Sequence, residues 1–104
     1  MDKFEYVNEL LSFYQDLLTE KQKEILHQYY YEDFSLSEIA ENMEISRNAV
    51  HDSMKKSIST MEKYESVLNM NEDYKKRNEI YQQLEKLEIS DVNTLVEKLR
   101  KLEE

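Results

Sequence analysis

Residues 35–54, SLSEIAENMEISRNAVHDSM, decide the fold of this chain, because they contain two helix starts separated by a short turn. Ser35 and Glu38 form a capping-box pattern, in which the serine hydroxyl accepts a hydrogen bond from a backbone amide and the glutamate side chain accepts one in return. Apolar residues follow at the spacings of an amphipathic helix: Leu36, Ile39, Ala40 and Met43. Ile45 fills the turn, and Ser46 is a second N-cap candidate. The stretch therefore predicts a helix-turn-helix.

The second helix of this pair carries the candidate binding residues. Its buried side would consist of Val50, Met54, Ile58 and Met61. In helix-turn-helix proteins the first residues of the second helix reach base edges in the major groove, while the first helix crosses the phosphate backbone. We therefore expect Arg47, Asn48 and His51 to touch base edges. Lys55 and Lys56 follow them and are expected to hold phosphates.

The turn between the two expected helices holds a residue that is unusual at its position. The place that is often glycine in such motifs is occupied by Glu44. A left-handed backbone costs a residue with a β-carbon about 1 kcal/mol or more, and a different turn geometry would avoid that cost. A carboxylate here would also lie near the phosphates of a bound duplex, which argues against DNA binding.

The composition narrows both the fold and the function. The chain has 104 residues and contains no glycine, proline or cysteine. Without glycine it has no phosphate-cradling loop, and without cysteine it has no disulfide or thiolate metal site. We therefore expect an all-α protein with no cofactor and no metal. No signal peptide and no apolar run long enough to span a bilayer is visible, which predicts a cytoplasmic protein without membrane insertion.

Charge separates one segment from the rest of the chain. The 23 acidic and 14 basic residues give a formal net charge of −9, whereas duplex-binding proteins usually present a basic face. Residues 47–63, the expected recognition helix, are net positive, and the segments on either side are net negative. The recognition helix thus suits nucleic acid, and the acidic remainder suits a basic protein partner.

Two further helices are expected before the helix-turn-helix. Residues 2–18 place apolar residues at alternating spacings of three and four: Phe4, Val7, Leu10, Leu11, Tyr14, Leu17 and Leu18. A second capping box at Thr19 starts a helix that ends near Tyr31. His27 has no second ligand at helical spacing, so we interpret it as solvated or at the edge of the core. The tyrosines at 29–31 could stack on bases, but such residues more often belong to the core and its rim.

After the helix-turn-helix the apolar stripe of the second helix continues: Tyr64, Val67 and Leu68 follow Met61. We expect one helix as far as residue 68, ended by Asn69, because asparagine adopts the left-handed conformation when glycine is missing. The small module alone would leave the stripe beyond Ile58 uncovered. The C-terminal segments or a second subunit would have to cover it, which predicts a homodimer.

The last third of the chain predicts a helical hairpin. One helix is expected over residues 72–88 and another from Ser90, which would be its cap. The basic triplet at 75–77 is more readily a salt-bridged surface than a phosphate contact, because acidic residues surround it. The chain would then divide into a helix-turn-helix domain at 1–68, with the motif itself at 35–63, and a C-terminal helical extension at 69–104.

Most of the chain resembles a known protein family, and one stretch carries most of the resemblance. Residues 13–56, FYQDLLTEKQKEILHQYYYEDFSLSEIAENMEISRNAVHDSMKK, with the charged helical tail that follows, resemble the YlxM family of small bacterial proteins. Residues 35–50 are also similar to the fourth region of bacterial sigma factors, in which SxxEIAxxxxISxxAV recurs. The resemblance is densest from Phe13 to Lys56 and only compositional after about Tyr81.

The resemblance implies an all-α fold of the sigma region 4-like, winged-helix-like DNA-binding class, with a long recognition helix and a C-terminal hairpin. It further implies a DNA-binding regulator with a role in the signal recognition particle pathway, because in Gram-positive bacteria the gene travels beside that of the particle's GTPase. Partners implied in this way are duplex DNA, RNA, and the signal recognition particle protein or its receptor.

Two other functional classes compete with DNA binding. The first is an acidic protein-interaction or RNA-binding module that contacts signal recognition particle components and does not bind DNA. The net charge of the chain favours this class. The second is an enzyme. The carboxylates are spread over helix faces and no nucleophile lies at a useful spacing from a base, so we expect no catalytic activity.

Overall fold

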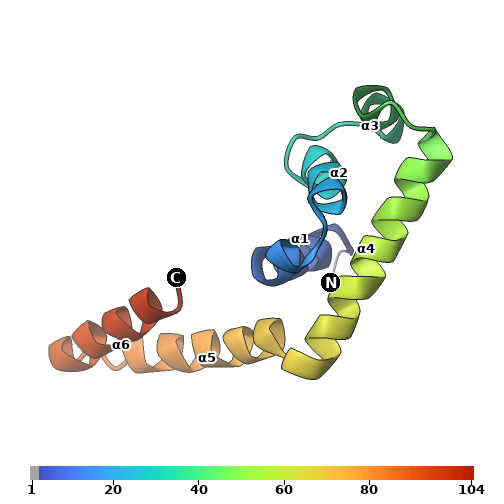
Figure 1. Ribbon diagram of the computed structural model, residues 1–104. Coiled ribbons are helices and arrows are strands. Elements are labelled where there is room, and N and C mark those ends of the chain that lie inside the picture. Colours follow the sequence, from blue (N-terminus) through green and yellow to red (C-terminus); the bar gives the residue numbers. More distant parts are fainter. Residues whose placement is uncertain (1–2) are drawn as a thin grey trace. The chain divides into compact units, whose positions relative to one another are not determined.

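The computed structural model describes residues 3–104, which form helices and no β-strand (Figure 1). The elements are α1 (Lys3–Tyr14), a short 3-10 turn η1 (Gln15–Leu17), α2 (Glu20–Tyr30), α3 (Leu36–Met43), α4 (Arg47–Leu68), α5 (Met70–Glu85) and α6 (Ser90–Leu102). They make two compact units, residues 1–71 and residues 72–104. The predicted all-α class and the helix-turn-helix are confirmed.

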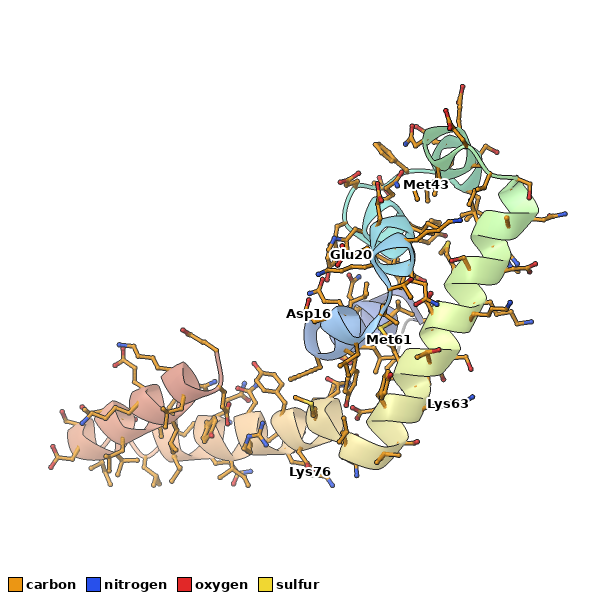
Figure 2. The ribbon with its side chains drawn as sticks, viewed as in Figure 1. Asp16, Glu20, Met43, Met61, Lys63 and Lys76 are labelled. Carbon is orange, nitrogen blue, oxygen red and sulfur yellow. The ribbon has the colours of Figure 1, made fainter. Side chains whose placement is uncertain are left out.

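The first unit is built around α4. The helices α1, α2 and α3 all pack against α4 and follow one another along the same side of it (Figure 1). The core that they share consists of Val7, Leu10, Leu11, Tyr14, Leu18, Ile25, Leu26, Ile39, Ala40, Val50, Met54 and Met61. Figure 2 shows Met61 directed from α4 towards α1 and Lys63 pointing away from the other helices. The periodic apolar pattern of α4 therefore decides which of its sides faces the core.

The stripe on α4 is covered further than the sequence predicts. Met61 is fully buried, and Tyr64 packs against the same core within the first unit. Burying a methionine side chain contributes about 1.5–3 kcal/mol. The expectation that another element or subunit must cover everything beyond Ile58 is therefore wrong as far as Tyr64. Only Val67 and Leu68, at the end of the helix, remain exposed.

Side-chain caps fix the starts of three helices as predicted. Thr19 and Ser35 each form a complete capping box, with Gln22 and Glu38 respectively. The Ser46 hydroxyl accepts a 3.0 Å hydrogen bond from the amide of Ala49 at the start of α4. Each such cap stabilises its helix by about 1 kcal/mol. These caps place α3 and α4 at either side of the turn.

The turn of the helix-turn-helix does adopt the left-handed conformation. Glu44 has φ 56° and ψ 42°, so the alternative geometry that would have avoided this cost is not used. The amide of Ile45 donates to the carbonyl of Ala40 at 3.1 Å, which is the six-to-one bond of a Schellman motif. The hydrogen bond and the partly buried Ile45 side chain hold the turn without glycine.

A polar network closes the end of the first unit at which α4 stops. The buried Tyr14 hydroxyl donates to Glu65 Oε1 at 2.6 Å and accepts from the amide of Met70 at 3.2 Å. Asn71 donates through its amide to the same Glu65 oxygen at 3.0 Å and through Nδ2 to Glu9 Oε2 at 3.0 Å. Residues 70 and 71, just after α4, are thereby tied to α1. Burial and the hydrogen bond to Glu65 raise the pKa of Tyr14 to about 12.

The second unit is an antiparallel hairpin of α5 and α6. Its buried apolar residues are Tyr81 and Val96. Glu103 accepts hydrogen bonds of 2.6 Å from the Tyr81 hydroxyl and from Arg77 Nε, and these contacts lower the pKa of its carboxyl group. Arg100 binds Glu85 at 2.8 Å on the other helix and lies over the Tyr81 ring. Charged contacts therefore supply much of what joins the two helices.

Several predicted details are wrong. The first helix ends at Tyr14 and not at residue 18, because η1 tightens the chain before the extended Leu18, and this turn leaves Leu17 exposed. The helix expected at 72–88 runs from Met70 to Glu85. Ser90 does not cap α6: the N-cap is Ile89, which makes no side-chain cap bond. The Asn69 cap, with φ 52°, is confirmed.

Candidate nucleic-acid interface

The predicted binding residues lie together on the first three turns of α4. Arg47, Asn48, His51, Lys55 and Lys56 are all exposed. The helix is held behind them by a stripe of buried residues that begins with Val50 and Met54, and α3 packs across its start. Nucleic-acid binding by the five side chains stays a prediction, and their exposure leaves them accessible for it.

The cations on this surface are not neutralised by neighbouring carboxylates. Within residues 3–104 the side chains of Arg47, Lys55 and Lys56 make no ion pair and no hydrogen bond. Basic residues of the hairpin behave differently, and several pair with carboxylates: Lys76 with Glu72, Arg77 with Glu103, Arg100 with Glu85 and Lys101 with Glu97. The prediction of a salt-bridged surface at 75–77 agrees with these contacts. Free charge on α4 remains available for phosphates.

A shallow groove runs beside α4 on the α2 side. Its volume is about 370 Å³, and it is lined by Lys21, Gln22, Ile45, Ala49, Asp52, Ser53 and Lys56. Lys21 comes from the first turn of α2, and its side chain makes no ion pair among the described residues. It adds a cation to this surface that was not predicted from the sequence. Its position inside the capping box, between Thr19 and Gln22, was the available signal.

The surface also contains carboxylates. The α3 helix and the turn carry Glu38, Glu41 and Glu44, all exposed, and no basic residue. Asp52 lies on α4 itself among the predicted readers, with its side chain 73% exposed. The side chains of the first helix of the motif therefore offer no positive charge to phosphates, whereas α4 and the neighbouring Lys21 do.

Residues elsewhere in the first unit have structural roles. His27 Nε2 lies 2.6 Å from Gln15 Oε1, and its ring packs against Tyr31, which confirms the edge-of-core interpretation. Tyr30 is partly buried and packs against the Phe4 ring, as expected of a core-rim tyrosine. Over residues 3–104 no three His, Cys, Asp or Glu side chains are grouped as metal ligands would be. No helix in that range is both long and apolar enough to cross a membrane.

Comparison with known proteins identifies the relatives of this chain. Residues 1–102 match the family described as "Putative helix-turn-helix protein, YlxM / p13 like". The UPF0122 protein YlxM of Bacillus subtilis is 40% identical over 99% of this chain and 98% of its own length. UPF0122 protein BH2485 of Halalkalibacterium halodurans is 48% identical over 81% of this chain and 77% of its own. A motif with this geometry and these matches show that the chain belongs to the YlxM/p13-like family of helix-turn-helix proteins.

Proposed function

We propose that this chain is a cytoplasmic regulatory protein that binds duplex DNA through the N-terminal half of α4. One observation carries the proposal: Arg47, Lys55 and Lys56 are exposed cations, unpaired among the described residues, on the second helix of a helix-turn-helix. They lie within residues 47–63, a net-positive segment of an acidic chain. Side chains at these places reach base edges and phosphates in helix-turn-helix proteins.

The proposal predicts a specific salt dependence. Each phosphate that is neutralised on B-DNA contributes about −0.9 to the slope of log affinity against log salt. Phosphate contacts from Lys55 and Lys56 would weaken binding about 12-fold between roughly 50 and 200 mM salt. Replacing both lysines by glutamine should remove most of that ratio, because neither phosphate contact remains.

Fluorescence anisotropy of a labelled random-sequence duplex measures this ratio directly. The matched control is Lys86→Gln with Lys98→Gln, which removes the same charge from two exposed lysines of the hairpin that make no ion pair among the described residues. The control should keep the wild-type ratio. Equal salt dependence in both double variants would show that binding is not made by α4.

Base contacts are tested separately from phosphate contacts. Arg47→Ala with Asn48→Ala should relax the preference for a selected sequence and cost about 1–3 kcal/mol for each base contact that the change removes. His51 is expected to read a base one turn further along the helix. A double variant that binds every duplex as the wild type does would rule out base reading by Arg47 and Asn48.

We also propose that the chain acts as a homodimer through its hairpin. Two exposed or partly exposed residues near the end of α5, one residue just after it and three of α6 are apolar: Ile80, Leu84, Leu87, Leu95, Leu99 and Leu102. Helical periodicity places the α5 pair and the α6 triplet on the same face of an antiparallel pair, and a two-fold axis would bury this face against its copy. Leu95→Glu with Leu99→Glu should give a monomer by light scattering, and a wild-type monomer would contradict the proposal.

The link to the signal recognition particle rests on the family resemblance. The competing function is an acidic module that contacts a basic particle protein, its receptor or the particle's RNA and does not bind DNA. It is favoured by the net charge of −9 and by the three glutamates of α3 and its turn. Affinity purification from cells that returned particle components with wild type but not with Glu41→Lys would support this function, and recovery of DNA alone would count against it.

A further inference from the structure

Asp52 lies at the centre of the surface that α4 would present to DNA. The buried stripe of the helix consists of Val50, Met54, Ser57 and Met61. With 3.6 residues per turn, the direction opposite this stripe passes through Asn48, Asp52 and Ser59. Lys55 and Lys56 lie on either side of that line. The carboxylate is thus more central on this surface than any of the basic residues.

The charge of Asp52 is not compensated by the residues around it. His51 Nδ1 lies 3.9 Å from Asp52 Oδ1 and therefore beyond hydrogen-bond distance. Lys55 and Lys56 stand one turn further along and, within residues 3–104, make no ion pair with it. With its side chain 73% exposed, the carboxylate is solvated in the free protein.

Docking against a duplex would remove water from the Asp52 carboxylate. The carboxylate would enter the major groove between phosphates that repel it, and it would lose the water that solvates it. Burying a charge without a hydrogen-bond donor is unfavourable. Among the groups on base edges in the major groove, the exocyclic amine of cytosine, N4, is the donor with which Asp and Glu pair. A guanine or thymine at the same place presents acceptors, which a carboxylate rejects, and adenine presents its N6 amine only beside the N7 acceptor.

We propose that Asp52 is a specificity-determining residue that requires the N4 amine of cytosine at the base it faces. The inference rests on the proposed binding of duplex DNA through α4. It gives the acidic residue a role in recognition: Asp52 weakens binding to duplexes in general and permits close docking only where a cytosine amine meets it.

Selection from a random duplex library tests this inference on the full-length chain. Wild type should select a sequence in which one position is cytosine, and replacing that cytosine by thymine should weaken binding about 10-fold or more. Asp52→Ala should lose the preference at that position and keep it elsewhere. Alanine is the best helix former, so the exposed substitution should leave α4 intact, which circular dichroism checks.

The matched control is Glu62→Ala, which removes one negative charge from the same helix at an exposed site about 15 Å further along its axis. Both variants share any general gain in affinity from the removal of a negative charge, so only a changed base preference counts. The same selected base at every position in wild type and Asp52→Ala would overturn the inference and leave DNA binding standing. No duplex binding by wild type at low salt would overturn both.

Discussion

Replacing Tyr14 by phenylalanine tests the polar network at the end of α4. The change removes one oxygen from a fully buried side chain and leaves the ring, which stacks on Tyr64 with centroids 6.1 Å apart. Two hydrogen bonds disappear, one donated to Glu65 at 2.6 Å and one accepted from the Met70 amide at 3.2 Å. Glu65 still accepts from the Asn71 amide.

The expected loss of unfolding free energy is about 2 kcal/mol. A hydrogen bond to a charged group contributes about 1.5–3 kcal/mol, and an amide left without its acceptor adds to the loss. The partial exposure of Glu65 lets water replace part of this stabilisation, which keeps the figure near the middle of that range. Tyr64→Phe is the matched control, because the Tyr64 hydroxyl makes no hydrogen bond among the described residues.

Urea unfolding followed by circular dichroism gives the free energies, and amide hydrogen exchange locates the change. In Tyr14→Phe the amides of Met70 and Asn71 should exchange faster than in wild type, because both donate into the network. The control should alter the free energy of unfolding by no more than about 0.5 kcal/mol, because it keeps the ring and removes only a hydroxyl that has no partner among the described residues, and it should leave both exchange rates unchanged. A Tyr14→Phe protein as stable as the control would refute the reasoning.

Tyr14 also makes the stability of the fold depend on pH in the alkaline range. Its pKa is raised from 10.0 to about 12 by burial and by the hydrogen bond to Glu65. A raised pKa means that the folded state holds the proton more tightly than the unfolded state, so the stabilisation is present below pH 10 and is lost as the pH rises towards 12. The loss of wild-type stability over this interval should be smaller in Tyr14→Phe.

Three further changes have expected outcomes. Glu44→Asn should stabilise the first unit by up to about 1 kcal/mol in urea unfolding, because asparagine tolerates the left-handed conformation that glutamate adopts here; a loss of stability would contradict this. Ser35→Ala should cost about 1 kcal/mol by removing a complete capping box, with Ser37→Ala at an exposed position of the same helix as control. Glu103→Gln should make the hairpin less sensitive to acid. The pKa of the Glu103 carboxyl group is lower in the folded state than in the unfolded state, so its charge stabilises the fold above the unfolded-state pKa, and this stabilisation is lost as the pH falls. Thermal unfolding across acidic pH would detect the difference.

Local signals in the sequence were sufficient for the helix-turn-helix. The hydroxyl caps at Thr19, Ser35 and Ser46 act within three residues, so their partners can be read directly from the sequence. Asn69 likewise ends α4 by its own conformational preference. Ser90 failed as a cap because Ile89 before it takes the extended backbone of the N-cap position, and a one-residue shift of this kind leaves no trace in the apolar pattern.

Long-range polar contacts could not be predicted in this way. Tyr14 and Glu65 are 51 residues apart in the sequence. Tyr14 belongs to the apolar stripe of one helix and Glu65 to the charged side of another, and neither pattern by itself indicates that the two side chains meet. The buried Gln28, which accepts a 3.0 Å hydrogen bond from Asn42, resembles a surface residue in the sequence. The central position of Asp52 on α4 follows from helical periodicity, but a search for basic residues alone passes over it.

The left-handed residues have a consequence for the unfolded chain. After α2, every connection between helices uses a positive φ at a residue other than glycine: Asp33, Glu44, Asn69 and Glu88. Glycine would relax each native turn, but it would also give the denatured ensemble many more conformations to lose on folding. A chain without glycine therefore begins from a stiffer random coil, and part of the strain in its turns is offset by the lower entropy that folding removes.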